Sequence, residues 1–558
     1  AYLPRAVTTI PFLDINRVEV LKGPQGTLYG RNATAGVVNM IPNRPEQEFD
    51  AFVRTRLGND ELVELEGMVN VPLTDTLALR ANIVDFSKDA LFDNTGTAEN
   101  PGIGDDLRER NYTFGRLALQ WDPTDDTRVL LAGDLEDRKE NTSYSIGVSE
   151  YAVSTDPFND DVGNDVPDRD EERDMYGVSL QVDHDLNDQM SLFGIVSYRD
   201  WDTFNKQDED GTTAPRRYLD TNNIEDSDIL YTEVRFNFVN NDFDVIVGAN
   251  YSSEEVYQRT DIGVLADSYM QFVSLELLPF AQDAGLIPPD VELDQDSHIW
   301  DFFADADDAT YLAFSELATS ITGSPTAVVP PSFAGTYFTE TMDNEGEFTN
   351  WGVFTDVTYQ LLDTVRLIGG IRYSYDEKEY SWQTFENNIG DWPVLPARVA
   401  YDPSQTGSDP SEYFNKYKDD DDWSKTTGRV VDEWDFSDVF QWGFIDSAKT
   451  YASFATGYKS GGFDGQSFTA LVSGPFDPED MTSYEWGQKG DFFDSRVRIE
   501  TALYYQELDG RQGSEEVKDS PDDQTAQPRV VTSDEETTGF EIRAQWQVLD
   551  TLRVMALT

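Results

Sequence analysis

The residues of this sequence that could bind a metal ion are concentrated in one acidic run. The segment 156–174 reads DPFNDDVGNDVPDRDEERD and is dense in carboxylates. Ca²⁺ takes about six to eight oxygen ligands, so this run is a candidate Ca²⁺ site, although its spacing does not match an EF-hand loop. The competing interpretation is a solvated acidic loop, the commoner role of a block of like charges. The candidate ligands are Asp160, Asp161, Asp165, Asp168 and Asp170.

No group of residues in the sequence points to catalysis. The chain has no cysteine and two histidines, His184 and His298, so neither a thiolate nor a histidine zinc site is expected. The glycines between Gly23 and Gly36 are spaced somewhat like a phosphate loop, but the Gly-Lys-Ser/Thr that completes such a loop is missing. We therefore expect a protein that is not an enzyme, whose glycines make structural turns and whose only candidate cofactor is Ca²⁺ in its loops.

The charge balance limits the possible partners. The net charge is −66, from 107 acidic and 41 basic residues. A surface this acidic repels nucleic acid and concentrates cations instead. Aromatic residues make up 13% of the chain, which suits β-strands and the aromatic girdles of a membrane barrel. No run of about 18 apolar residues is present, so no transmembrane helix is predicted.

The elements that must position these loops are predicted to be strands. In 230–238 and 365–375, apolar residues alternate with polar or charged ones, and a period of two predicts a strand with one apolar and one wet face. The pattern recurs in 51–57, 496–506 and 540–548. We count about 17 such segments, each roughly the length of a tilted membrane strand. Because single-chain bacterial barrels have an even number of strands, we expect strands to be missing at the C-terminus.

The links between the strands alternate in length. Short Asn/Asp turns such as Asn187-Asp188 and Asn241-Asp242 alternate with long acidic links such as 139–172 and 258–346. An outer-membrane barrel has tight periplasmic turns and long extracellular loops. The alternative of another class is a secreted or surface all-β adhesion protein with Ca²⁺-stabilised loops. It would share the alternation and the acidity, but it has no reason to alternate its link lengths.

Residues near both ends resemble one known family. Residues 15–45 read INRVEVLKGPQGTLYGRNATAGVVNMIPNRP and closely resemble the end of the plug domain of TonB-dependent receptors. The segments 451–465, 483–510 and 537–547 resemble barrel strands of that family. The matching plug residues are Arg17, Glu19, Lys22, Gly23, Pro24, Gly26, Tyr29, Gly30, Arg31 and Gly36.

The resemblance implies an all-β fold, a transmembrane antiparallel β-barrel of the roughly 22-stranded type with part of a plug inside. Residues 1–47 would be the C-terminal part of the plug, and residues 48–558 a barrel that is incomplete at its C-terminus. The N-terminal part of the plug, including the segment that binds TonB, is expected to lie outside this chain.

The resemblance also suggests residues for two kinds of site. Plug–barrel ion pairs are expected among Arg17, Arg31, Glu485 and Glu541, although both glutamates can equally be ordinary lumen-facing residues. Aromatic side chains in the predicted extracellular loops are candidates to grip an apolar or ring-bearing ligand, or else they belong to an interface girdle. These candidates are Trp382, Trp392, Trp423, Phe463 and Phe468.

By resemblance, the function is active uptake of a scarce ligand across the outer membrane of a Gram-negative bacterium. The most frequent ligands in the family are iron chelates such as ferric siderophores, and the alternatives are glycans, haem and cobalamin. The implied partners are TonB with its energising ExbB/ExbD complex, the lipid bilayer and its lipopolysaccharide. The acidic loops disfavour an anionic ferric siderophore unless Ca²⁺ neutralises them.

Overall fold

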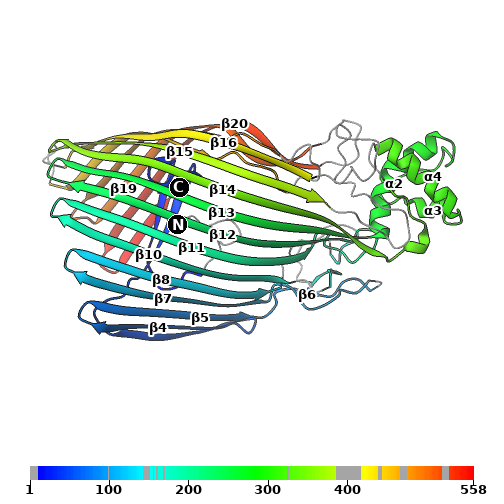
Figure 1. Cartoon of the computed structure of the whole chain (residues 1–558), viewed down its shortest axis with the longest axis horizontal. Helices are drawn as coiled ribbons and strands as arrows, with labels where there is room; N and C mark the ends of the chain where they lie inside the picture. Colours follow the sequence, from blue (N-terminus) through cyan, green and yellow to red (C-terminus); the bar gives the residue numbers. More distant parts are fainter. Residues whose placement is uncertain are drawn as a thin grey trace.

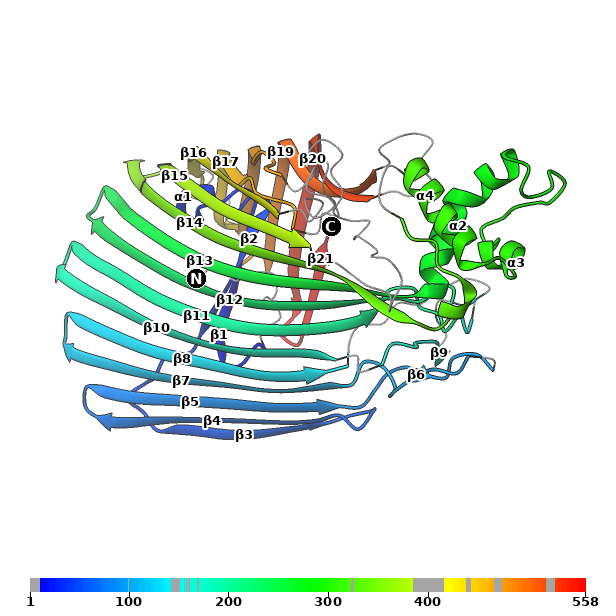
Figure 2. The same ribbon diagram turned by 45° about the vertical axis from the view of Figure 1, so that its right-hand side comes forward.

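The computed structural model describes residues 11–558 apart from Glu99, 142–150, Thr155, Pro157, 159–160, 168–169, 323–325, 385–415, 438–442, 466–473 and 518–526. Within that part of the chain, seventeen strands form one closed antiparallel barrel in cyclic sequence order, the number that the alternation predicts. Figures 1 and 2 show these long, tilted strands as one wall around a small inner domain. The stacked sheets that an adhesion protein would need are not formed by the described residues.

The barrel strands are β3 (Asp50–Leu57), β4 (Val63–Thr74), β5 (Leu77–Lys88), β7 (Arg110–Thr124), β8 (Thr127–Glu140), β10 (Glu171–Asn187), β11 (Met190–Asp208), β12 (Leu219–Val239), β13 (Phe243–Leu265), β14 (Tyr337–Leu362), β15 (Val365–Thr384), β16 (Lys416–Asp435), β17 (Ile445–Lys459), β18 (Glu479–Phe492), β19 (Val497–Val517), β20 (Gln527–Leu549) and β21 (Leu552–Leu557).

The pairing registers keep the outward and inward side chains of neighbouring strands aligned around the barrel. Each barrel strand pairs antiparallel with the next from β3 through β21, and directly opposite residues share a face. On β12, Val234 is 60% exposed on the outside whereas its neighbour Glu233 is 4% exposed toward the lumen. The outer face is therefore apolar and the inner face polar, as the sequence predicts.

The outer face changes from apolar to acidic toward the end that carries the long loops. One row of paired residues is aromatic over three of its four strands and consists of Thr232, Tyr251, Trp351 and Tyr375. The row four residues nearer the long loops is entirely acidic and consists of Asp228, Glu255, Glu347 and Glu379. Aromatic side chains mark the interfaces of a membrane barrel, so the acidic row lies just outside the apolar band.

The plug segment lies inside the barrel. It consists of β1 (Ile15–Lys22), the short helix α1 (Gly26–Tyr29) and β2 (Gly36–Pro42), and β1 pairs antiparallel with β2. Figure 2 shows these elements behind the strands of the near wall. A Cβ on Gly26 would lie 2.9 Å from the carbonyl oxygen of Thr456 in β17. This glycine therefore allows α1 to approach the barrel wall at backbone distance.

A helical insertion between β13 and β14 occupies most of the long acidic link predicted at 258–346. It contains α2 (Ala266–Asp283), α3 (Ile299–Phe303), α4 (Asp308–Thr322) and the 3₁₀ turn η2 (Pro331–Phe333), and it lies beyond the strand ends in Figures 1 and 2. The insertion has its own apolar core, which includes Met270, Leu277 and Tyr311. That core explains why the segment folds, because its apolar residues cover one another.

Several strands extend past the predicted boundaries into the predicted loops. Strand β16 begins at Lys416, so Trp423 lies in a strand instead of a predicted extracellular loop. Two short strands in the loops, β6 (Asp93–Asn94) and β9 (Asp161–Val162), pair in parallel. None of the helices in the described residues is both long and apolar enough to cross a membrane.

Candidate functional site: plug contacts and the vestibule above them

A buried ion pair fixes the plug to the barrel wall. Arg31, which follows α1, places Nη1 3.2 Å from Oδ1 of Asp376 in β15 and Nη2 3.8 Å from Oε2 of Glu254 in β13. The hydroxyl of Tyr458 donates to Asp376 Oδ2 at 2.7 Å, and Asn350 Nδ2 donates to Oδ1 at 2.9 Å. The Asp376 side chain is 0% exposed, so its charge depends on these donors for stabilisation.

A second pair fixes the other end of the plug. Arg80 of β5 donates from Nε and Nη2 to the two oxygens of Asp14, both at 2.6 Å, and Asn43 Nδ2 donates to Asp14 Oδ1 at 2.8 Å. This bidentate geometry is the strongest form of a charged hydrogen bond. Lys22 of β1 also pairs with Glu541 of β20, one of the glutamates predicted to contact the plug. The two side chains are 69% and 36% exposed, so that pair contributes little.

The ion pairs expected from the sequence have different partners in the structure. Arg31 contacts the barrel, but through Asp376 and Glu254 instead of Glu485 or Glu541. Arg17 pairs with Glu19 on the same face of its own strand at 2.7 Å. Glu485 accepts a hydrogen bond from Tyr451 across the β17·β18 pair at 2.5 Å. The family motif thus pointed to charged residues of the plug and the barrel, but it did not predict which residue each one pairs with.

A polar and aromatic cavity opens directly above the Arg31 pair. This cavity, here called the vestibule, has a volume of about 310 Å³. Tyr380 and Phe463 stack with ring centroids 5.0 Å apart, and Lys378 Nζ lies 5.3 Å from the Phe348 ring centroid. The side chains and backbone that line it belong to Glu225, Glu254, Val256, Gln258, Asn344, Glu345, Gly346, Phe348, Lys378, Tyr380, Gly462, Phe463, Gly465 and Phe476.

Hydrogen bonds fix the vestibule's loop to its wall. Tyr380 donates its hydroxyl to Asn344 Oδ1 at 2.7 Å, and Asn344 Nδ2 donates to the carbonyl of Gly465 at 2.7 Å. The 460–465 segment, which follows β17, therefore packs against β14 and β15. Glu254 lines the vestibule and also faces Arg31 of the plug, so a ligand in the vestibule and the plug share one side chain.

The predicted ligand-binding aromatics are only partly brought together. Phe463 lines the vestibule, whereas Trp382 and Trp423 are buried, at 1% and 8% exposure. A Cβ on Gly461 would lie 2.5 Å from the Trp423 ring, so that tryptophan supports the loop from beneath. Trp392 and Phe468 lie outside the described residues. Sequence reasoning missed Phe348, Lys378 and Tyr380, and the signal that could have found them is their place on the lumen face of long strands.

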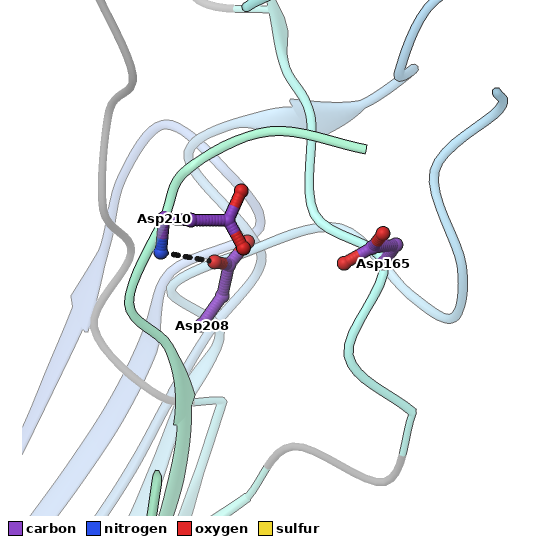
Figure 3. Close-up of side chains that lie close together, drawn as sticks. All are labelled: Asp165, Asp208 and Asp210. Atoms are coloured by element: carbon purple, nitrogen blue, oxygen red, sulfur yellow. Dashed lines mark hydrogen bonds between the residues drawn. The ribbon is translucent and has the colours of Figure 1, made fainter. Parts of the chain in front are cut away.

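Three aspartates gather at the loop end of the barrel, as Figure 3 shows. One carboxylate oxygen each from Asp165, Asp208 and Asp210 lies within 4.8 Å of the others. Asp208 Oδ1 accepts a hydrogen bond from the backbone N–H of Asp210 at 2.9 Å. Asp208 is buried, with 1% of its surface exposed. Burial and the neighbouring carboxylate of Asp210 raise the pKa of Asp165 to about 7. Burial likewise raises the pKa values of Asp208 and Asp210.

This cluster changes the predicted ligand set. Asp165 belongs to the cluster, but its companions do not come from the 156–174 run. Asp208 is the last residue of β11, and Asp210 lies in the link that follows it. Asp161 lies exposed in β9, and Asp170 is exposed just before β10. Asp160 and Asp168 lie outside the described residues. Spacing along the chain could not show this cluster, because its members approach only when two loops fold together.

Comparison with known proteins defines the family. The model described as TonB-dependent Receptor Plug Domain matches residues 3–37, and the model described as TonB dependent receptor-like, beta-barrel matches residues 282–557. The chain belongs to the TonB-dependent receptor family. Members of this family are receptors and transporters of the Gram-negative outer membrane, and this chain is an outer-membrane β-barrel of that kind.

Individual relatives are distant. The chain is 27% identical over 113 residues to the pesticin receptor of Yersinia pestis, covering 20% of this chain and 16% of the relative. It is 24% identical over 186 residues to the ferrichrome outer membrane transporter/phage receptor of Escherichia coli K12, covering 32% and 23%. The ferric yersiniabactin uptake receptor FyuA from Yersinia pestis superposes with a TM-score of 0.66 at 15% identity, covering 98% of this chain and 67% of that one. The matched segments thus span less than a quarter of these two curated relatives.

Proposed function

We propose that this protein is a TonB-dependent transporter that takes up a small iron chelate, a ferric siderophore. The observation that carries the proposal is the shared Glu254, which lines the vestibule and faces Arg31 of the plug. A ligand that contacts Glu254 changes the electrostatic environment of Arg31, because the two charged side chains are only 11% and 12% exposed and therefore poorly screened. Occupancy of the vestibule is thereby communicated to the plug.

In this proposal, the ion pairs between the plug and the barrel are the contacts that TonB must break. TonB, energised by ExbB and ExbD in the inner membrane, must displace the plug against the buried Arg31–Asp376 and Arg80–Asp14 pairs. Loss of one partner of such a pair costs about 3 to 5 kcal/mol, because the other charge is left buried and uncompensated. In this proposal the two pairs help to hold the plug in place until TonB acts.

The vestibule supports a chelate better than haem. Haem iron in proteins is held by an axial His, Cys, Met or Tyr. His298 is buried in the helical insertion, and His184 contacts Thr127 at the opposite end of the barrel wall. Neither histidine lines the vestibule, and Tyr380, which does line it, donates its hydroxyl to Asn344 and stacks on Phe463. Sequences of relatives named for siderophores and iron point the same way.

Growth under iron limitation tests this function. A strain that lacks the complete receptor is supplied with single sources of iron, as ferric siderophores or haem, and in parallel with cobalamin or glycans as the limiting nutrient. The proposal predicts that the receptor restores growth on a ferric siderophore and that a functional TonB is needed. If the receptor restores growth on a glycan or cobalamin source but not on any iron source, the proposed ligand class is wrong.

We further propose that Ca²⁺ binds Asp165, Asp208 and Asp210 and joins the two loops that carry them. Three carboxylates this close repel one another, and a hard cation relieves that repulsion. Asp165 Oδ1 is buried without a hydrogen-bond partner, which leaves it available as a ligand. Calorimetric titration with Ca²⁺ is expected to show one site that Asp208→Asn removes and that the exposed control Asp161→Asn retains. Equal binding by both variants would refute the site.

A further inference from the structure

The charged side chains that face the vestibule are mostly acidic. Among the described residues that line it, Lys378 is the only cation, whereas Glu225 and Glu254 are acidic. Glu345 contributes backbone to the lining, but its side chain lies on the outer face of β14, on the same side as Glu347. Glu225 accepts hydrogen bonds from Trp201 Nε1 at 2.6 Å and from Gln258 Nε2 at 2.8 Å. Both donors are neutral, so they orient the Glu225 carboxylate without compensating its charge.

The cation beneath the vestibule does not reverse this balance. Arg31 lies between Asp376 and Glu254, so one guanidinium serves two carboxylates. Lys378 faces the Phe348 ring, and a Cβ on Gly462 would lie 3.2 Å from its Nζ. A single ammonium group in such a confined place can contact one oxygen of a ligand, but it cannot compensate several negative charges.

The route into the vestibule is also anionic. The helical insertion, residues 266–336, has twelve Asp and Glu residues and no Lys or Arg. On the neighbouring loop, Arg216 and Arg217 pair with Asp301 and Asp296 of the insertion, so these two cations are already compensated. A mouth with this balance raises the local concentration of cations and lowers that of anions.

We propose that the vestibule selects ferric chelates without net negative charge, of the tris-hydroxamate type, and discriminates against tris-catecholates. Three hydroxamate groups just balance the charge of the ferric ion, and an added amine makes the complex cationic. Three catecholate groups carry twice the charge of the ferric ion and leave a strongly anionic complex. The aromatic rings of Phe348, Tyr380, Phe463 and Phe476 contact the carbon skeleton of either type, so charge makes the difference. This inference rests on the proposed uptake of ferric chelates.

Binding to the complete receptor in detergent tests the inference. The probes are a neutral ferric tris-hydroxamate, a cationic one with a free amine and a ferric tris-catecholate, each titrated at low and high salt. The two hydroxamates are expected to bind at least about tenfold more tightly than the catecholate, with a ratio that shrinks as salt screens the charges. Equal or tighter binding of the catecholate would overturn the charge selection and leave iron uptake standing. If no ferric chelate binds, the proposed function fails as well.

Charge variants localise the effect to the vestibule. Glu225→Gln keeps an oxygen that can accept from Trp201 but removes a negative charge, and it is expected to reduce the hydroxamate preference severalfold. The matched control is Glu379→Gln, because Glu379 lies in β15 next to Lys378 but on the outer face of the barrel. The control is expected to leave the preference unchanged. If Glu379→Gln changes the preference as much as Glu225→Gln does, selection arises from the whole surface and the inference is wrong.

Discussion

Removal of the Arg31 guanidinium is expected to loosen the plug within an intact barrel. In Arg31→Met, the fully buried Asp376 carboxylate keeps its hydrogen bonds from Tyr458 and Asn350 but loses its cation at 3.2 Å. An uncompensated buried charge costs about 3 to 5 kcal/mol. Because two neutral donors remain, we expect the lower end of that range, which corresponds to roughly a hundredfold change in the equilibrium for plug opening.

Hydrogen exchange of the complete receptor in detergent measures that equilibrium. Amides of β1 and β2 are expected to exchange roughly a hundredfold faster in Arg31→Met, whereas amides in the middle of β12 and β13 keep their protection. Arg17→Met is the matched control, since Arg17 is exposed and pairs only within its own strand, so its loss costs less than about 1 kcal/mol.

A double variant separates lost charge balance from lost packing. Adding Asp376→Asn to Arg31→Met removes the buried charge that the single variant leaves behind, and the asparagine oxygen can still accept from Tyr458. Most of the protection of β1 and β2 is expected to return. Unchanged exchange in Arg31→Met, or an equal effect of Arg17→Met, would refute the assignment of this pair as the main plug contact.

Further predictions concern the plug turn, the lipid-facing band and the aspartate cluster. Gly36→Ala places a Cβ 2.4 Å from the Leu21 carbonyl and is expected to disrupt the β1·β2 pair, seen as faster exchange of both strands with the barrel retained. Val234→Arg on the lipid-facing side is expected to destabilise the barrel by about 2 to 4 kcal/mol in folding titrations with lipid vesicles, whereas Asp228→Arg in the acidic row is expected to cost much less. Because the pKa of Asp165 is raised to about 7, its contribution to loop stability is present below pH of about 4 and is lost as pH rises through about 7. Without Ca²⁺ the loop amides should therefore lose protection as pH rises from about 4 to about 7 and change little at higher pH. Added Ca²⁺ should restore the protection, and protection that rises with pH in the absence of Ca²⁺ would contradict this sign.

The barrel could be predicted from the sequence because its signal is local. A period of two along 230–238 places Val234 and Glu233 on opposite faces, and nothing distant is needed to interpret it. The plug was predicted for another reason, the resemblance of a contiguous motif. Both the alternation and the plug motif can be recognised in a single sequence, because each consists of residues that are close together along the chain.

The contacts that define the site could not be predicted in the same way. Arg31 and Asp376 are 345 positions apart, and no spacing rule links a plug arginine to one carboxylate among 107 acidic residues. The aspartate cluster unites two loops, so its ligand set depends on how those loops fold. The helical insertion was missed because its acidic surface residues matched an expected acidic loop, while the apolar spacing of α2 around Met270, Val273 and Leu277 indicated a helix core.

Energised uptake of a labelled ferric chelate is the most direct measurement of the central claim. Cells that express the complete receptor are supplied with radiolabelled iron as a neutral tris-hydroxamate complex, with TonB present or deleted. The proposed function predicts accumulation that needs the receptor and TonB and that stops when the proton gradient is collapsed. Iron accumulation that is the same without TonB, or the same without the receptor, would contradict it.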